Sequence, residues 1–168
     1  MIEFKRMTED SYRNFVASGV ADFAEENVKS GEWDVADAQE KAQKELADLL
    51  PNGLETLNHF LFDLVDPSKG ERVGVLWFAL RGPQERRSVF IYDVRIDPHF
   101  QRQGYATQAF EVLKEKVRAL GAKSVHLHVF GHNQGARALY ESLGFVTTHL
   151  MMELDVTSGQ SLTLQDTE

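Results

Sequence analysis

The chain has 168 residues, the size of one domain with a single core, and its 42% apolar and 26% charged content is ordinary for a globular protein. Its formal net charge of −8 argues against a nucleic-acid surface. No run of about 18 apolar residues predicts a membrane-spanning helix. The chain has no cysteine, which excludes a disulfide framework and a cysteine nucleophile. The expected location is therefore the cytoplasm, with neither a nucleic acid nor a membrane as partner.

The first fifty residues predict a short strand followed by two helices. Residues 2–7 alternate as in a strand, and apolar residues then recur at helical spacing over 12–23 and 35–50, with a break at Ser30 and Gly31. Thr8 is suited to cap the first helix. Residues 1–50 hold six Lys/Arg and twelve Asp/Glu, a net charge of −6, against −2 for the rest of the chain. A solvated helix face is the simplest explanation of this charge.

The middle of the chain predicts strands and one long helix. Residues 56–65 and 72–80 are apolar runs separated by a turn-rich break, and they indicate an antiparallel pair. In the next strand Phe90, Tyr92, Val94 and Ile96 alternate with Ile91, Asp93, Arg95 and Asp97. Pro98 ends that strand. Helical periodicity then runs from Ala106 to Leu120.

The last third predicts a strand over 124–130, a helix over 133–143, and a strand from Phe145 into the Met151–Met152 region. The expected fold class is therefore α+β, with a mixed, mostly antiparallel central sheet flanked by helices and one parallel crossover. We expect a single domain over residues 1–156. The polar residues 157–168 are expected to form a loose tail.

Two sequence motifs within these predicted elements indicate a function. The first is the run Gln101-Arg102-Gln103-Gly104-Tyr105-Ala106-Thr107, which joins a strand to a helix. A glycine at a helix start allows close approach of the backbone, and the free amides of the first turn favour an anion such as a pyrophosphate. The pattern resembles the acetyl-CoA loop of the GNAT N-acetyltransferase superfamily. An ordinary strand-to-helix turn is the alternative.

The second motif is the run from Asn133 to Phe145, with Ala-x-x-Leu-Tyr at 136–140 and Leu-Gly-Phe at 143–145. It is similar to the second GNAT hallmark and follows the first motif in the same order. The resemblance implies a GNAT fold and an enzyme that moves the acetyl group of acetyl-CoA to a primary amine by direct attack. It also implies that backbone groups of Val94, Arg95 and Ile96 hold the pantetheine arm and that residues 101–107 hold the pyrophosphate. Asn133 would bond the cofactor arm, cap the last helix, or do both.

The resemblance implies that Tyr140 is the acid that protonates the departing thiolate, while a role in filling the core is the alternative. The base is less defined. Some family members carry a glutamate early in the central strand, where this chain has Phe90. Asp93 is the substitute, although it is expected on the opposite face from Phe90 and can also be a partner for an arginine. Water can carry the proton instead. His126 and His128 are interpreted as core histidines, and no metal site is expected.

In the family, the first two helices help to wall the acceptor site, and here they carry Asp22, Glu25, Glu26, Glu32, Asp34 and Asp37. A cationic acceptor is therefore expected, either a small molecule or a peptide or protein amine. The alternative function is a regulatory module that binds acyl-CoA without turnover. Dimers are common in the family, so a homodimer is compatible with the resemblance, and the sequence itself does not indicate an oligomeric state.

Overall fold

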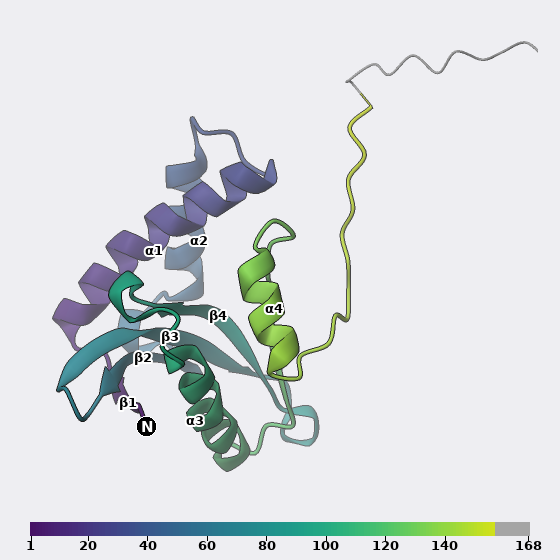
Figure 1. Ribbon diagram of the computed structural model, residues 1–168. Helices are drawn as coiled ribbons and strands as arrows, with labels where there is room; N and C mark the ends of the chain where they lie inside the picture. Colours follow the sequence, from purple (N-terminus) through teal and green to yellow (C-terminus); the bar gives the residue numbers. More distant parts are fainter. Residues whose placement is uncertain (157–168) are drawn as a thin grey trace, which may run out of the picture.

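A computed structural model describes residues 1–156 and contains one five-stranded sheet (Figure 1). The strands lie in sequence order and are β1 (Glu3–Arg6), β2 (His59–Asp66), β3 (Glu71–Arg81), β4 (Ser88–Ile96) and β5 (Ser124–Leu127). The first four pair antiparallel, and β5 joins β4 in parallel. The predicted α+β class with a mixed, mostly antiparallel sheet is confirmed.

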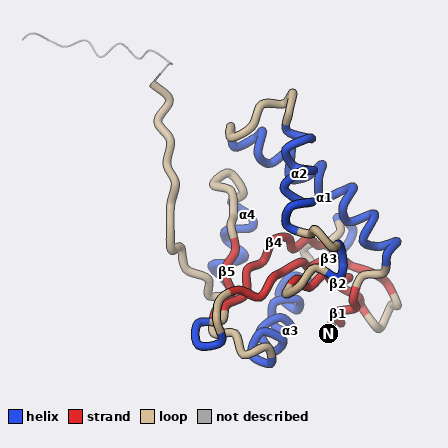
Figure 2. The backbone as a smooth tube through the Cα atoms, turned by 180° about the vertical axis from the view of Figure 1, so that it is seen from behind, coloured by secondary structure: helices blue, strands red, loops and turns tan. Residues whose placement is uncertain are grey.

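Helices cover both faces of the sheet (Figures 1 and 2). The helices are α1 (Glu9–Ser30) and α2 (Ala38–Leu49) on one face, and α3 (Tyr105–Ala119) and α4 (Gln134–Ser142) on the other. Three single turns of 3-10 helix, η1 (Gly53–Glu55), η2 (Gln84–Arg86) and η3 (Pro98–Phe100), lie in the connections. The predicted break after the first helix is Gly31, whose φ of +81° is the left-handed conformation that ends a helix.

Each face of the sheet has its own apolar core. On the α3 side, Leu113 and Phe110 pack against Leu76, Phe78 and Val89, all of which are buried. On the α1 side a second cluster is built from Met7, Phe15, Leu50, Leu54, Leu61, Val75 and Trp77. The sheet is thus a central layer between two apolar layers, which explains why β3 reads as a continuous apolar run.

A β-bulge in β4 changes which residues share a face. Trp77 of β3 pairs with Asp93, and the next residue, Phe78, pairs with Ile91, so Tyr92 is an extra residue. The ring of Tyr92 stacks on Trp77 with centroids 4.4 Å apart, which holds the bulge. Strict alternation across the whole strand was therefore the wrong expectation. Asp93 does not lie opposite Phe90, because the extra residue shifts the alternation by one and leaves both on the α1 side.

The bulge is also where β4 and β5 separate. Their parallel pairing runs from Ser88 with Ser124 to Ile91 with Leu127 and ends there. Beyond Ile91, the edge of β4 that faces β5 has no strand partner among residues 1–156. The result is an opening between the two strands, with free backbone groups on one side of it.

Two sequence-based expectations about the C-terminal third are wrong, and a third concerns residues outside the described part of the chain. Residues 145–156 form no strand, because a strand needs a neighbouring strand for its backbone groups and none of the five described strands pairs with this segment. His126 and His128 are exposed and are not core histidines, since they lie on the side of β5 away from its apolar residues. The predicted loose tail, 157–168, lies outside the described residues.

Candidate active site

The open edge of β4 is the first component of the site. Val94, Arg95 and Ile96 pair on one side with Leu76, Val75 and Gly74 of β3, and on the other side they face the opening toward β5. A Cβ on Gly74 would lie 2.1 Å from the carbonyl oxygen of Arg95. Only glycine permits this approach of the two strands, so Gly74 holds the edge in place.

The loop that follows β4 is held by two of its own side chains. The Gln101 Nε2 donates to the carbonyl oxygen of Ile96 at 2.9 Å, and the Gln103 Nε2 donates to that of His99 at 2.8 Å. Arg102 and Gly104 both adopt left-handed conformations, with φ of +60° and +83°. The two glutamine side chains are thus engaged with backbone, and the loop offers a ligand its amides and the exposed Arg102.

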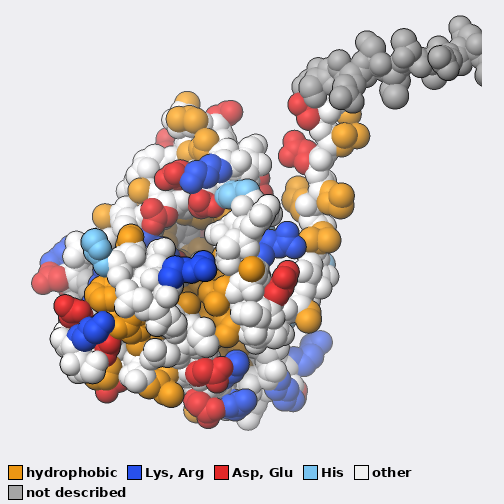
Figure 3. Space-filling model, viewed as in Figure 1, with side chains coloured by type: hydrophobic (Ala, Val, Ile, Leu, Met, Phe, Trp, Pro, Cys, Tyr) orange, Lys and Arg blue, Asp and Glu red, His pale blue; other side chains and the backbone are white. Residues whose placement is uncertain are grey.

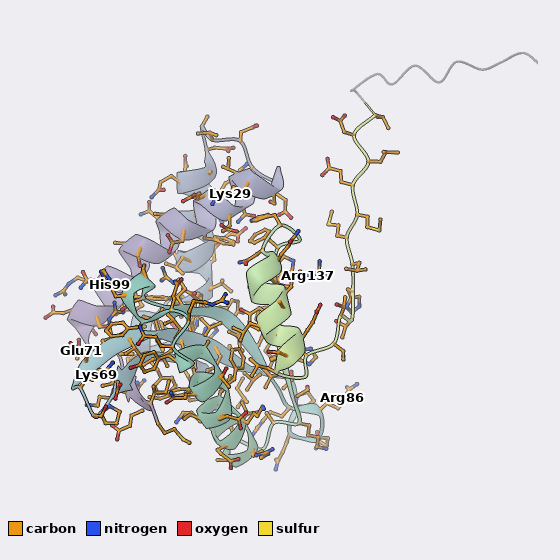
Figure 4. The ribbon with its side chains drawn as sticks, viewed as in Figure 1. Lys29, Lys69, Glu71, Arg86, His99 and Arg137 are labelled. Carbon is orange, nitrogen blue, oxygen red and sulfur yellow. The ribbon has the colours of Figure 1, made fainter. Side chains whose placement is uncertain are left out.

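The start of α3 continues this surface. Gly104 is the N-cap and provides no side-chain cap, so the first-turn amides of Tyr105, Ala106 and Thr107 are not capped by it. The side chain of Tyr105 is buried, and its hydroxyl donates to the Asp66 Oδ2 at 2.7 Å. Lys69 donates to the same hydroxyl at 3.0 Å from the β2–β3 turn (Figure 4). Tyr105 can therefore meet a ligand only through its backbone.

Hydrogen bonds at that turn also perturb Asp66. The hydroxyl of Ser68, and after it the hydroxyl of Tyr105, lowers the pKa of Asp66 to about 2. The carboxylate is thus ionised at neutral pH and anchors the β2–β3 turn to the first residue of α3.

Asn133 is the N-cap of α4, and Tyr140 lies within that helix. The Asn133 Oδ1 accepts a hydrogen bond from the amide of Ala136 at 3.1 Å, so its helix-capping role is present. Tyr140 is half-buried, with its ring against Phe110 and Phe145 at centroid distances of 5.8 and 5.7 Å. Burial raises the pKa of Tyr140, and the negative charge of Asp93 raises it further. The two residues singled out for catalysis therefore influence each other electrostatically.

Asp93 follows the bulge and is paired with Arg95. The Arg95 Nε lies 2.9 Å from the Asp93 Oδ2, and the same guanidinium pairs with Asp22 and donates to the Ser18 hydroxyl at 3.3 Å. Burial raises the pKa of Asp93 to about 6, with Asp22 adding to the rise and Arg95 opposing it. Because 21% of its side chain stays exposed, the carboxyl remains accessible to a proton donor.

A cavity of about 560 Å³ lies beside this cluster. Its wall on α1 includes Phe15, Ser18 and Asp22, its wall on β4 runs from Val94 to Asp97, and it reaches Gln101. It thus connects the Arg95 cluster with the loop before α3. The space-filling view shows the molecule hollowed between α1 and α4, with apolar atoms at the bottom (Figure 3).

The resemblance implies that the first two helices help to wall the acceptor site, but it does not indicate which stripe of α1 meets β4 and the loop before α4. Ser18, Asp22 and Glu26 recur every four residues and so share a helix face. Asp22 binds Arg95, and the Glu26 Oε2 lies 2.6 Å from the His132 Nε2 in the loop before α4. The spacing was visible, but nothing in it indicated which partner the stripe would meet.

Comparisons with known proteins agree with this geometry. The model of the acetyltransferase (GNAT) family matches residues 21–145. YdgE of Bacillus subtilis, an uncharacterized N-acetyltransferase, is 34% identical over 87% of this chain and 92% of its own length. YycN of the same organism is 38% identical over 87% and 93%. Its crystal structure superposes with a TM-score of 0.87, covering 93% of this chain and 99% of that one.

The chain belongs to the GNAT acetyltransferase family, and it is an acetyl-CoA-dependent N-acetyltransferase. A shorter match, 38% identical over 55 residues and 33% of this chain, is to the ribosomal protein bS18-alanine N-acetyltransferase of Escherichia coli. Within residues 1–156, no helix is long and apolar enough to cross a membrane.

Proposed function

We propose that this enzyme transfers the acetyl group of acetyl-CoA to a cationic primary amine by direct attack, with its thioester bound in the opening between β4 and β5. The pantetheine arm would pair with Val94, Arg95 and Ile96 as an added strand, with Asn133 as a further hydrogen-bond partner. The pyrophosphate would lie against residues 101–107. The observation that carries the proposal is the edge of β4 beyond Ile91, which has no strand partner among residues 1–156 and so leaves backbone groups free for the pantetheine arm.

Tyr140 would be the general acid. In the proposed step the amine nitrogen attacks the thioester carbon, the carbon–sulfur bond breaks, and the sulfur leaves as a thiolate that takes the phenolic proton. A raised pKa keeps that proton on Tyr140 at neutral pH. Its hydroxyl makes no hydrogen bond to any group of residues 1–156, so it is available to the sulfur.

Asp93 would receive the proton that the amine loses, directly or through one water. With a pKa raised to about 6, it is ionised at neutral pH yet more basic than an ordinary carboxylate. Arg95 and Asp22 would hold it in place, while burial accounts for most of the rise in its pKa. Water as the only proton carrier is the alternative that the Asp93→Asn experiment below distinguishes.

The acceptor preference is inferred from charge. Part of the negative charge of residues 1–50 is paired, as with Asp22 on Arg95 and Glu26 on His132. Glu32 and Asp34, in the α1–α2 connection, are exposed and would attract a cationic acceptor. The similarity to the bS18-alanine enzyme makes a peptide N-terminus one acceptor to test, beside polyamines, aminoglycosides and lysine.

The test is thiol release from acetyl-CoA over a panel of cationic, neutral and acidic amines, with the products identified by mass. We expect cationic amines to be preferred and the preference to weaken with salt, because exposed charges are screened over about 10 Å at 0.1 M. Preference for neutral or acidic amines at low salt would contradict the charge argument. Stabilisation by acetyl-CoA without turnover on any amine would favour the non-catalytic module; about 2.7 kcal/mol is expected at a hundredfold excess over Kd.

A further inference from the structure

The bulge that places Asp93 is held by aromatic side chains from three neighbouring strands (Figure 1). The ring of Tyr92, the extra residue of β4, stacks on Trp77 of β3 and on His59 of β2, with centroids 4.4 and 5.5 Å apart. The Trp77 Nε1 also donates a hydrogen bond to the His59 Nδ1 at 3.0 Å. A continuous series of contacts therefore runs from β2, across β3, to the residue before Asp93.

Trp77 is the member of this series on which Tyr92 depends. The extra residue of a bulge is left out of the ladder, so side-chain contacts have to hold it. Tyr92 also accepts a hydrogen bond from Arg81 at 2.6 Å, but that arginine is exposed. Trp77 is buried, and it packs edge-on against Phe15 of α1. Because a buried N–H needs a partner, the hydrogen bond to His59 fixes how the indole is turned.

This hydrogen bond also defines the protonation state of His59. An indole N–H can only donate, so the His59 Nδ1 carries a lone pair and the ring proton is on Nε2. Burial of the ring, and after it the charge of Arg81 on β3, lowers the pKa of His59. The histidine is therefore neutral at neutral pH, and its bond to Trp77 is present there.

From these contacts we infer that His59 is a positioning residue for Asp93. Its hydrogen bond fixes the indole of Trp77, the indole holds Tyr92 in the bulge, and the bulge directs the next side chain, the Asp93 carboxyl, into its mostly buried position. The inference concerns where that carboxyl lies, and it rests on the proposed function only in its effect on turnover.

The pKa of Asp93 reports this position. Burial is the largest cause of its rise, Asp22 of α1 adds to the rise, and Arg95 of β4 opposes it. Tyr140 of α4 is the titratable group that Asp93 affects in return. A carboxyl that the bulge no longer directed would gain solvent, so its pKa would fall toward the ordinary 3.8. A histidine that only added stability would leave this pKa unchanged.

Two substitutions separate the contacts of His59. His59→Phe keeps a ring beside Tyr92 and removes the acceptor, whereas His59→Asn removes the ring and keeps an acceptor, its Oδ1, in place of the Nδ1. The signal is the carbon-13 resonance of the Asp93 carboxyl, assigned by its loss in Asp93→Asn and followed as a function of pH. We expect a midpoint near 6 in the wild type and in His59→Asn, and a lower one in His59→Phe. An unchanged midpoint in His59→Phe, or an equal fall in both variants, would overturn the inference.

Turnover gives a second reading of the same variants. His59→Phe should lose about tenfold or more in kcat, with acetyl-CoA affinity unchanged, and His59→Asn should recover most of the loss. The matched control is His126→Phe, the same change at a β5 histidine whose ring contacts Ser124, and it should behave as the wild type. If Asp93 is not the base, Asp93→Asn keeps its turnover, while the carboxyl midpoint still decides the positioning role.

A measurement on the wild type does not depend on any variant folding. The nitrogen-15 shifts of His59 report which ring nitrogen carries the proton, and at neutral pH we expect a neutral ring with its proton on Nε2. A proton on Nδ1 would leave the Trp77 indole without its acceptor and would overturn the inference.

Discussion

The loop before α3 and the pair formed by Asp93 and Tyr140 are built in different ways. The loop is a continuous stretch whose left-handed residues Arg102 and Gly104, with the side chains of Gln101 and Gln103, orient backbone amides. Asp93 and Tyr140 are 47 positions apart, and Asp93 raises the pKa of Tyr140 only because the bulge in β4 and the placement of α4 set their positions.

This difference predicts that the two parts tolerate change differently. A backbone site depends on which conformations its residues can adopt, and most of its side chains can vary. A site made from distant side chains depends on their functional groups and on every element that positions them. The predictions below test this contrast.

The largest effect is expected at Gly104. Gly104→Val should remove measurable acetyl-CoA binding, because a β-branched side chain would occupy the space of the pyrophosphate and oppose the φ of +83°. Gly121→Val is the matched control, since Gly121 ends the same helix with φ of +72° and equally open space. Both variants should lose roughly 1–2 kcal/mol of stability. Calorimetry with equal affinities for the two folded variants would show that the loop does not bind the cofactor.

The second-largest effect is expected for Tyr140→Phe. It keeps the ring that packs on Phe110 and removes only the hydroxyl, so turnover should fall about 10²-fold or more while acetyl-CoA affinity and melting temperature stay nearly unchanged. Tyr12→Phe, on α1, is the control and should remain active. If Tyr140→Phe stays within a few-fold of the wild type, Tyr140 has only a packing role and solvent protonates the thiolate.

Asp93 should affect how both turnover and stability depend on pH. As the base, it should make turnover rise with pH through about 6, and Asp93→Asn should remove that step. The pKa of Asp93 in the folded protein is raised above its ordinary value of 3.8, so the folded state binds this proton more tightly than the unfolded state does. The free energy of unfolding should therefore fall as the pH rises through the folded-state pKa. The two-unit difference corresponds to roughly 3 kcal/mol.

Denaturant unfolding of the wild type and Asp93→Asn between pH 4 and 8 measures this dependence. The wild type should lose stability relative to the variant between about pH 4 and 7. Parallel curves for the two proteins would mean that Asp93 is not perturbed in the folded state.

The smallest effect is expected at Tyr105. Tyr105→Phe removes the hydroxyl that bonds Asp66 and Lys69 and should cost about 1.5–3 kcal/mol of stability, the usual contribution of a hydrogen bond to a charged group. Acetyl-CoA affinity should change by no more than a few-fold, because in the proposed site only the amide of Tyr105 would face the ligand. A large loss of affinity in calorimetry would show that the side chain, and not the backbone alone, shapes the site.

Much of the fold was predictable because it depends on local periodicity. Both helical stripes before residue 50, the antiparallel pair β2–β3, the helix after Gly104 and the cap at Asn133 follow from apolar spacing and from residues that start or end helices. The family followed from two motifs for the same reason, since each is a contiguous run.

Tertiary structure alone decided the rest. The bulge at Tyr92 depends on stacking against Trp77, a residue in another strand, so the sequence of β4 could not indicate which face Asp93 would take. The contacts of Asp22 with Arg95 and of Glu26 with His132 join residues 73 and 106 positions apart. The alternation of 146–156 predicts a strand by itself, but a strand exists only where another strand accepts its backbone hydrogen bonds, and none of the five described strands pairs with this segment.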